Sequence, residues 1–379
     1  MISARLFNSV VCVNPTCRAG EGGAPLLRRV QGHLRCPRCG HTYEVYAPGY
    51  LKLMPHGEEG EGTSHMSHTS LYVSHEEEFA HTLDYRRVGL PLLGAGVRQR
   101  AIRRMLKPTG QDRLVELGCG NGKFLVWNRR QVDWAVGVDP APLFAAEALA
   151  GVDLVQADAR ALPFPAGTFT AAISIDVLEH LTLPDIHRYL AEAHRVLTPG
   201  GRLFIFSNTR EGSRLDFVVR NVRRLSRWLG ERGLIDDTRD RLRKSDHVKA
   251  IQTFDQLQAV LSRNGFRVEQ VMFWNGLFQS VIENLLVKLA ESALRKLRRG
   301  EASRAVGGAS GGGPTGEDAL RSSVRRRLAR RGPAYSVMML LTNLMWLDLV
   351  LFGRWRAGPY FLVAVREGRE VRNHLPVNG

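Results

Sequence analysis

The stretch LVELGCGNG, residues 114–122, decides the fold of this 379-residue chain. Its first four residues form a short, mostly apolar run that is typical of a buried parallel strand. Three glycines follow at alternate positions, Gly118, Gly120 and Gly122. Glycines let the backbone turn tightly and come close to a ligand at the start of the next helix, expected at 123–129. Taken alone, this turn fits either a nucleotide site or an ordinary connection.

Strand-like and helix-like segments alternate after the glycine turn. Further strands are expected at Trp134–Val138, Asp153–Gln156, Phe169–Ile175, Arg202–Ser207, Phe266–Phe273 and Tyr360–Val365. Intervening helices are expected at Pro142–Ala150 and Pro184–Leu197. Repeated strand–helix units form parallel sheets covered on both faces. We therefore predict an α/β fold with a seven-stranded, mostly parallel, Rossmann-like sheet and helices on both faces.

Acidic residues follow three of these strands. Asp139 lies 22 residues beyond Leu117, about where a ribose-binding carboxylate belongs in a nucleotide-binding unit. Asp158 follows the third strand. Asp176 begins the sequence DVLEH (176–180) after the fourth. Because carboxyl ends of parallel strands meet at one edge of a sheet, we expect these acids to border one site.

Five segments in this order resemble the class I S-adenosylmethionine-dependent methyltransferase family. They are ELGCGNG (116–122), Asp139, Asp158-Ala159, LPFP (162–165) followed by Phe169, and LTPGG (197–201). The resemblance covers about residues 85–273, with a return near 359–366. A dehydrogenase-type dinucleotide site is disfavoured, because the second glycine pair is G-x-G and not G-x-x-G.

The resemblance implies S-adenosylmethionine as the cofactor. It assigns Glu116 to the methionine end of that molecule, Asp139 to both ribose hydroxyls and Asp158 to the adenine amino group. Cys119 lies inside the glycine turn, either as a contact or as a small filler beside the cofactor. The full set of expected cofactor-binding residues is Glu116, Gly118, Cys119, Gly120, Gly122, Asp139, Asp158, Ala159 and Ile175.

The acceptor side of the site is expected after the fourth strand. The sequence there lacks an Asn/Asp-Pro-Pro-aromatic tetrapeptide, which argues against amino methylation of adenine or glutamine. It looks like the group that includes ubiquinone-pathway O-methyltransferases, in which these acids and the histidine lie at the acceptor and can hold a divalent metal. The resemblance implies Asp176, Glu179, His180 and His247 as catalytic candidates, with His180 as a general base. Glu179 and His180 equally fit a cap for the next helix.

Four of the five cysteines lie before residue 40, in two pairs separated by eighteen residues. The pairs are Cys12 with Cys17 and Cys36 with Cys39. Four thiolates in two such knuckles suit a tetrahedral structural zinc, although reduced cysteines without metal remain an alternative. Residues LRCPRCG (34–40), Tyr43, Val45, Pro48-Gly49 and LMP (53–55) resemble the zinc-ribbon activator subunit of tRNA and translation-factor methyltransferases. Similar ribbons are also fused to the front of many bacterial methyltransferases, an arrangement that fits better here, and in either case the resemblance implies a structural ribbon.

We predict five segments in the chain. They are a zinc-ribbon module at 1–55, a linker at 56–75, a methyltransferase core at 76–273 with a basic helical insertion at 209–248, a helical and partly disordered insertion at 274–357, and the last core strand with a tail at 358–379. The second insertion ends in an apolar stretch, Tyr335–Phe352, that contains Asn343 and Asp348. This stretch fits a helix buried against Leu277–Leu297, a hairpin dipping into one leaflet or, least well because of the acid, a membrane span.

The net charge is +16, of which residues 210–249 carry +5 and residues 294–331 carry +8. Charge placed in this way suggests an anionic partner such as a membrane surface, a nucleic acid or a phosphorylated substrate. Only 7 of the 53 basic residues are lysines, so a solvated face in an arginine-rich proteome is the alternative.

We therefore predict a methyltransferase that acts on oxygen of a small or lipid-linked acceptor near an anionic membrane surface. The expected location is cytoplasmic, peripheral on the inner face of the membrane, because no secretory signal opens the chain. No obligate protein partner is evident from the sequence. The alternatives are methylation of tRNA or rRNA, which makes a nucleic acid the partner, and a cofactor-binding scaffold without catalysis.

Overall fold

The computed structural model describes residues 2–46, 49–54, 86–235, 248–293, 328 and 331–368. The predicted linker at 56–75, the catalytic candidate His247 and most of the low-complexity part of the second insertion lie outside these residues.

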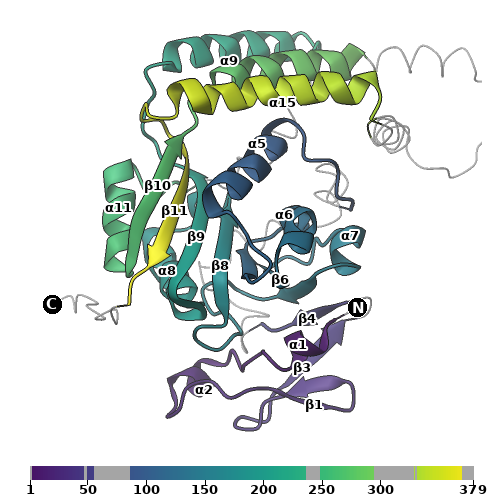
Figure 1. Ribbon diagram of the computed structural model, residues 1–379, viewed down its shortest axis with the longest axis vertical. Helices are drawn as coiled ribbons and strands as arrows, with labels where there is room; N and C mark the ends of the chain where they lie inside the picture. Colours follow the sequence, from purple (N-terminus) through teal and green to yellow (C-terminus); the bar gives the residue numbers. More distant parts are fainter. Residues whose placement is uncertain are drawn as a thin grey trace, which may run out of the picture.

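A mixed sheet of eleven strands runs through the molecule, in the order β1-β2-β3-β4-β7-β6-β5-β8-β9-β11-β10 (Figure 1). Its central and C-terminal strands are β5 (Arg113–Leu117), β6 (Trp134–Asp139), β7 (Asp153–Gln156), β8 (Phe169–Ile175), β9 (Leu197–Asn208), β10 (Phe266–Phe273) and β11 (Pro359–Arg366). Strands β5 to β9 are parallel, and β11 lies antiparallel between β9 and β10. The α/β fold and the seven expected strands are present, but the sheet is larger than predicted.

The four additional strands come from the N-terminal module. This module contains α1 (Ala4–Phe7), α2 (Pro15–Ala19), β1 (Arg28–Val30), β2 (His33–Arg35), β3 (Thr42–Tyr46) and β4 (Tyr50–Lys52). Strand β4 pairs in parallel with β7, with Leu51 opposite Val155 and Lys52 opposite Gln156. This pairing covers the backbone groups that β7 would otherwise expose at the sheet edge. The module is therefore an extension of the sheet.

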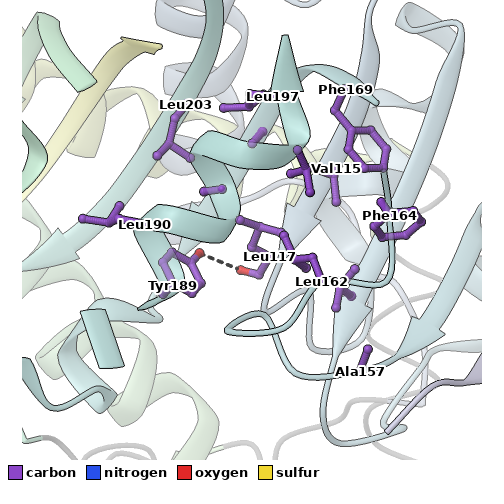
Figure 2. Close-up of a cluster of buried hydrophobic side chains, with 14 of the residues drawn as sticks. Val115, Leu117, Ala157, Leu162, Phe164, Phe169, Tyr189, Leu190, Leu197 and Leu203 are labelled. Carbon is purple, nitrogen blue, oxygen red and sulfur yellow. Dashed lines mark hydrogen bonds between the residues drawn. The ribbon is translucent and has the colours of Figure 1, made fainter. Parts of the chain in front are cut away.

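Helices cover both faces of the sheet. They are α5 (Leu93–Ala101), which continues as the π-helix η1 (Ile102–Leu106), α6 (Lys123–Asn128), the short η2 (Arg129–Gln131), α7 (Ala146–Leu149), η3 (Leu178–His180), α8 (Leu183–Val196) and α11 (Phe254–Arg263). The Thr182 hydroxyl caps α8 by accepting from the Asp185 N–H. Figure 2 shows Tyr189 of α8 beside Leu117 of β5, and Leu190 and Val115 belong to the same buried cluster. The Tyr189 hydroxyl also donates to the Leu117 carbonyl at 3.4 Å, which ties α8 to the strand before the glycine turn.

Three further helical segments form a layer at one end of the molecule, at the top of Figure 1. They are α9 (Asp216–Glu231), α12 (Leu277–Val281) with its continuation η4 (Ile282–Val287), and α15 (Pro333–Phe352). We call these segments the helical layer. They follow β9, follow β10 and precede β11, respectively. Sheet pairing puts Asn208 opposite Pro359 and Phe273 opposite Tyr360, so all three segments leave from the carboxyl end of the parallel strands.

One face of α15 packs on the protein. The Leu93 N–H of α5 donates to the Thr342 hydroxyl at 2.8 Å, and the Arg100 guanidinium lies 4.8 Å from the ring centre of Trp346. Within the described residues, α15 has the length and composition of a membrane span, with a mean hydropathy of 1.6 over a window that is 28% buried. The opposite face carries exposed apolar side chains such as Leu340 and Val350.

The inner face of α15 also carries a carboxyl group. Asp348 is 0% exposed, and neither oxygen has a hydrogen-bond partner of ordinary geometry in the described chain. Burial raises the pKa of Asp348 to about 6, although backbone N–H groups at the start of α12 oppose this shift. Above about pH 6 Asp348 is ionised in the folded protein, and its buried charge destabilises the fold. Below about pH 4 the acid is neutral in the folded and the unfolded protein, and this cost disappears.

We expect Asp348→Asn to stabilise the protein at pH 8 by about 2–3 kcal/mol, because it removes the cost of a buried charge. The gain should shrink toward zero near pH 4. Urea unfolding at several pH values measures it, with the exposed Glu231→Gln as the matched control. A gain that does not depend on pH would contradict this explanation.

Candidate cofactor and acceptor site

The three glycines after β5 adopt backbone conformations that other residues rarely take. Their φ angles are 74° at Gly118, 51° at Gly120 and 78° at Gly122. A Cβ atom at Gly118 would lie 2.5 Å from a methyl carbon of Val177, and one at Gly122 would lie 2.8 Å from the Ala148 Cβ. Conformation disfavours side chains at all three positions, and lack of space excludes them at Gly118 and Gly122, so the turn leaves its backbone open to a ligand at the start of α6.

Asp139, at the end of β6, is bound to this turn. One carboxylate oxygen accepts from the Gly120 N–H at 2.7 Å, and the other accepts from the Ala141 N–H at 2.9 Å. Burial raises the pKa of Asp139 to about 6, while these two hydrogen bonds oppose the shift. Asp139, the residue predicted to bind the ribose, thus lies beside the glycine turn.

Glu116 provides the clearest indication of a site for a cationic ligand. It is 1% exposed, and its Oε2 atom has no hydrogen-bond partner in the part of the chain that the structure describes. Burial raises the pKa of Glu116 well above the usual range for a carboxyl group, and the negative charge of Asp139 adds to this effect. A buried acceptor without a partner fits the amino group of the predicted cofactor. The residues present therefore fit S-adenosylmethionine.

The other expected cofactor residues border the same edge. The Arg160 side chain donates to both carboxylate oxygens of Asp158, at 2.6–3.0 Å, so an adenine contact would add to an existing ion pair. Ile175 is buried at the end of β8, and Ala159 is half-buried beside the core. The Cys119 thiol packs in the apolar cluster that contains Leu125 and Leu154, as a small filler would.

On the acceptor side, Glu179 is buried beside the end of β9. It is 4% exposed, and one carboxyl oxygen accepts from the Ser207 hydroxyl of β9. Burial, with the nearby negative charge of Asp176, raises the pKa of Glu179 to about 7. A carboxyl group that titrates near neutral pH can accept and release a proton at physiological pH. His180 follows it in η3 and is half-buried.

The Asp176 side chain faces α5. Its φ angle is 56°, an unusual value for a residue other than glycine, and its side chain is 46% exposed. One carboxylate oxygen lies 3.4 Å from Nη2 of Arg98, a residue of α5. The Arg98 guanidinium also lies over the rings of Phe206 and Trp274, at 4.4 and 5.8 Å from the ring centres. Arg98 is thus a candidate acceptor-binding residue that the sequence analysis missed, because it lies in no motif and its contacts come from residues far along the chain.

The structure does not assemble the expected divalent metal site from Asp176, Glu179 and His180. Within the described ranges, the four cysteines are the only group of three or more side chains whose ligand atoms converge. The two carboxylates have different partners, Ser207 for Glu179 and Arg98 for Asp176.

The four cysteines of the N-terminal module do converge. All four sulfur atoms lie within 4.8 Å of one another, and the Cys12–Cys39 and Cys17–Cys36 distances are both 3.8 Å. Tetrahedral zinc with bonds of about 2.3 Å separates its sulfur ligands by about 3.8 Å. Burial would raise the pKa of Cys36, but N–H groups of Cys39 and Arg38 lower it to about 7, which favours a thiolate. None of the cysteines is in a disulfide, so the set fits a bound zinc ion.

The module is joined directly to the adenine side of the site. The Leu53 N–H donates to the Gln156 carbonyl and the Val11 N–H to the Pro163 carbonyl, both at 2.9 Å. Gln156 ends β7, two residues before Asp158. A folded N-terminal module therefore supports the segment that carries Asp158, the residue expected to bind adenine.

Comparison with known proteins agrees with this geometry. Residues 115–205, from β5 to β9, match the family described as "Methyltransferase domain". This match agrees with the class predicted from the motifs, an S-adenosylmethionine-dependent methyltransferase.

Two curated relatives and one solved structure illustrate the range of similar proteins. A Bos taurus protein named "Probable tRNA methyltransferase 9B" is 35% identical over 111 residues, 29% of this chain and 24% of that protein. The "Ubiquinone biosynthesis O-methyltransferase" of Azorhizobium caulinodans is 28% identical over 133 residues, 33% of this chain and 52% of that protein. Phosphoethanolamine N-methyltransferase 2 of Haemonchus contortus, solved with S-adenosyl-L-methionine, aligns over 81% of this chain and 61% of that chain, with 17% identity and a TM-score of 0.43.

We expect Cys36→Ser to lower the zinc content of the purified protein and its Tm by roughly 5 °C or more, because metal binding supplies folding energy to a small module. Cofactor affinity should fall as well, since β4 supports β7. Atomic emission, thermal unfolding and calorimetric titration with S-adenosylmethionine measure the three effects. Arg28→Gln, an exposed change in the same module, is the control. Equal zinc content in both variants would contradict a metal role for these cysteines.

Proposed function

We propose that the protein transfers the methyl group of S-adenosylmethionine to an acceptor bound over the carboxyl ends of β8 and β9. The observation that carries this proposal is the buried Oε2 atom of Glu116, which no described residue partners, beside a glycine turn held by Asp139. The cofactor supplies an electrophilic methyl group on a sulfonium, so the protein has mainly to bind, orient and deprotonate the acceptor. Glu116, Asp139 and Asp158 are the residues that would hold the cofactor.

The acceptor is proposed to be methylated on oxygen. Glu179 takes the proton of the acceptor hydroxyl, since a carboxylate with a pKa of about 7 is a suitable general base near neutral pH. His180 is the second candidate for this role. The name of the Azorhizobium relative, an O-methyltransferase of ubiquinone biosynthesis, supports a small lipophilic acceptor. The apolar helical layer over the same end of the sheet supports it too. A cytoplasmic location, peripheral on the inner face of the membrane, belongs to the same proposal.

A second candidate function is methylation of RNA. The name of the bovine relative, the net charge of +16 and the exposed arginines of α9 favour it. The four cysteines hold a structural zinc under either proposal. A cofactor-binding scaffold without catalysis is the remaining alternative.

Methyl-labelled cofactor distinguishes these functions. We expect label from the incubation of purified protein with lysate of the source organism to enter the organic-solvent fraction. Asp139→Ala should abolish the transfer, because it removes the carboxylate that holds the glycine turn. Label in the RNA fraction would replace the lipophilic acceptor with RNA, and label no higher than in the Asp139→Ala control would favour the scaffold.

The labelled acceptor fraction then permits a test of Glu179. Below pH 7 the rate should rise about tenfold per pH unit and then level off, because only the deprotonated carboxylate accepts the proton. Glu179→Gln should lower the rate at pH 8 by about 100-fold or more and remove this dependence on pH. The exposed Glu269→Gln is the control. An unchanged pH profile in Glu179→Gln would transfer the role of base to another group.

A further inference from the structure

Exposed apolar side chains gather on the outer surface of the helical layer. Among the described residues, twelve of the sixteen large hydrophobic side chains that are exposed belong to this layer or to the segments that join it to the sheet. They include Phe217 at 70% exposure, Leu340 at 59% and Val350 at 60%. Scattered exposed hydrophobic residues are normal, but a concentration on one face marks an interaction site.

The spacing of these residues places them on the outer sides of α9 and α15. Leu225 and Trp228 lie eight and eleven residues after Phe217, which puts the three side chains on one side of α9. The inner side of α9 holds Ser226, which donates to the Asn284 carbonyl of η4 at 2.8 Å. The outer side of α15 similarly presents Val337, Leu340, Leu347 and Leu351, at successive intervals of three, seven and four residues. Both helices are therefore fixed by their inner sides, and the described residues leave their apolar outer sides uncovered.

Arginines border this apolar surface. Arg220, Arg223, Arg224 and Arg227 of α9 are all exposed. In the described parts of the chain, no ion pair involves Arg223, Arg224 or Arg227. A second copy of the chain would bring like charges together across a two-fold axis, which is unfavourable. An anionic lipid surface accepts both groups, apolar side chains below its headgroups and guanidinium groups on its phosphates.

We propose that the helical layer docks on an anionic lipid bilayer, with α9 and α15 lying in the plane of the headgroups. The layer covers the carboxyl end of the sheet, so docking places the acceptor site next to the bilayer. It also contacts α5 directly, because the Gly94 N–H donates to Glu283 of η4 at 2.8 Å. Only one part of this inference rests on the proposed function, namely that a lipophilic acceptor enters the site from the bilayer.

Vesicle flotation of the full chain tests the docking surface. We expect the protein to float with vesicles of phosphatidylglycerol and phosphatidylcholine, and to bind pure phosphatidylcholine about tenfold more weakly. Leu340→Gln combined with Leu351→Gln should reduce binding to the anionic vesicles roughly tenfold, as should Arg223→Gln combined with Arg227→Gln. Added salt should weaken binding of the wild-type protein more than that of the arginine variant.

Matched controls lie on exposed positions of other elements. Leu26→Gln with Val30→Gln in the N-terminal module, and Arg28→Gln with Arg130→Gln, should leave flotation unchanged. Equal losses in these controls, or binding independent of lipid charge, would overturn the proposal. The proposal would also be overturned if the wild-type protein sediments as a dimer and Leu340→Gln combined with Leu351→Gln sediments as a monomer. A second copy of the chain would then cover the surface. Flotation needs no methyl transfer, so this proposal and the proposed function can fail separately.

Discussion

Five parallel strands present all their carboxyl ends at one edge of the sheet, and the rest of the molecule is arranged around that edge. Each strand end brings a different side chain or turn to the same place, namely the glycine turn after β5, Asp139 after β6, Asp158 after β7, Asp176 after β8 and Ser207 at the end of β9. Parallel pairing makes this convergence unavoidable, because successive strands must return through helices before they pair again. The antiparallel pairs of β9, β10 and β11 add the helical layer to the same edge.

Much of this arrangement follows from local sequence. The apolar runs predicted the core strands within a few residues, and glycine and acid positions predicted the cofactor edge, because both depend on backbone conformation and strand periodicity. The short α7 shows the limit of that approach. A helix is expected over Pro142–Ala150, yet α7 covers only Ala146–Leu149, since residues before it turn to bind the glycine segment, as in the Ala145 N–H that donates to the Asn121 carbonyl.

Contacts between distant segments could not be predicted in this way. Strand β4 lies about a hundred residues before β7, and nothing in either segment specifies that they pair. Arg98 likewise acquires its position from Asp176, Phe206 and Trp274, each on a different element. The expected metal ligands of the acceptor side fail for the same reason. Their spacing allows convergence, but a hydroxyl on the neighbouring strand β9 draws Glu179 inward.

The buried acids connect the stability of the fold to its ligand. Burial raises the pKa of both Glu116 and Asp139, so each is held in the folded protein at a cost relative to water. A cationic ligand at this edge would lower that cost, since an opposite charge favours the ionised carboxyl. Ligand binding should then stabilise the folded protein in proportion to its concentration over its Kd. The carboxyl end of the parallel strands is thus a place where burial of acidic side chains costs stability that a cationic ligand would restore. The extended sheet on one side and the helical layer on the other supply packing that offsets this cost.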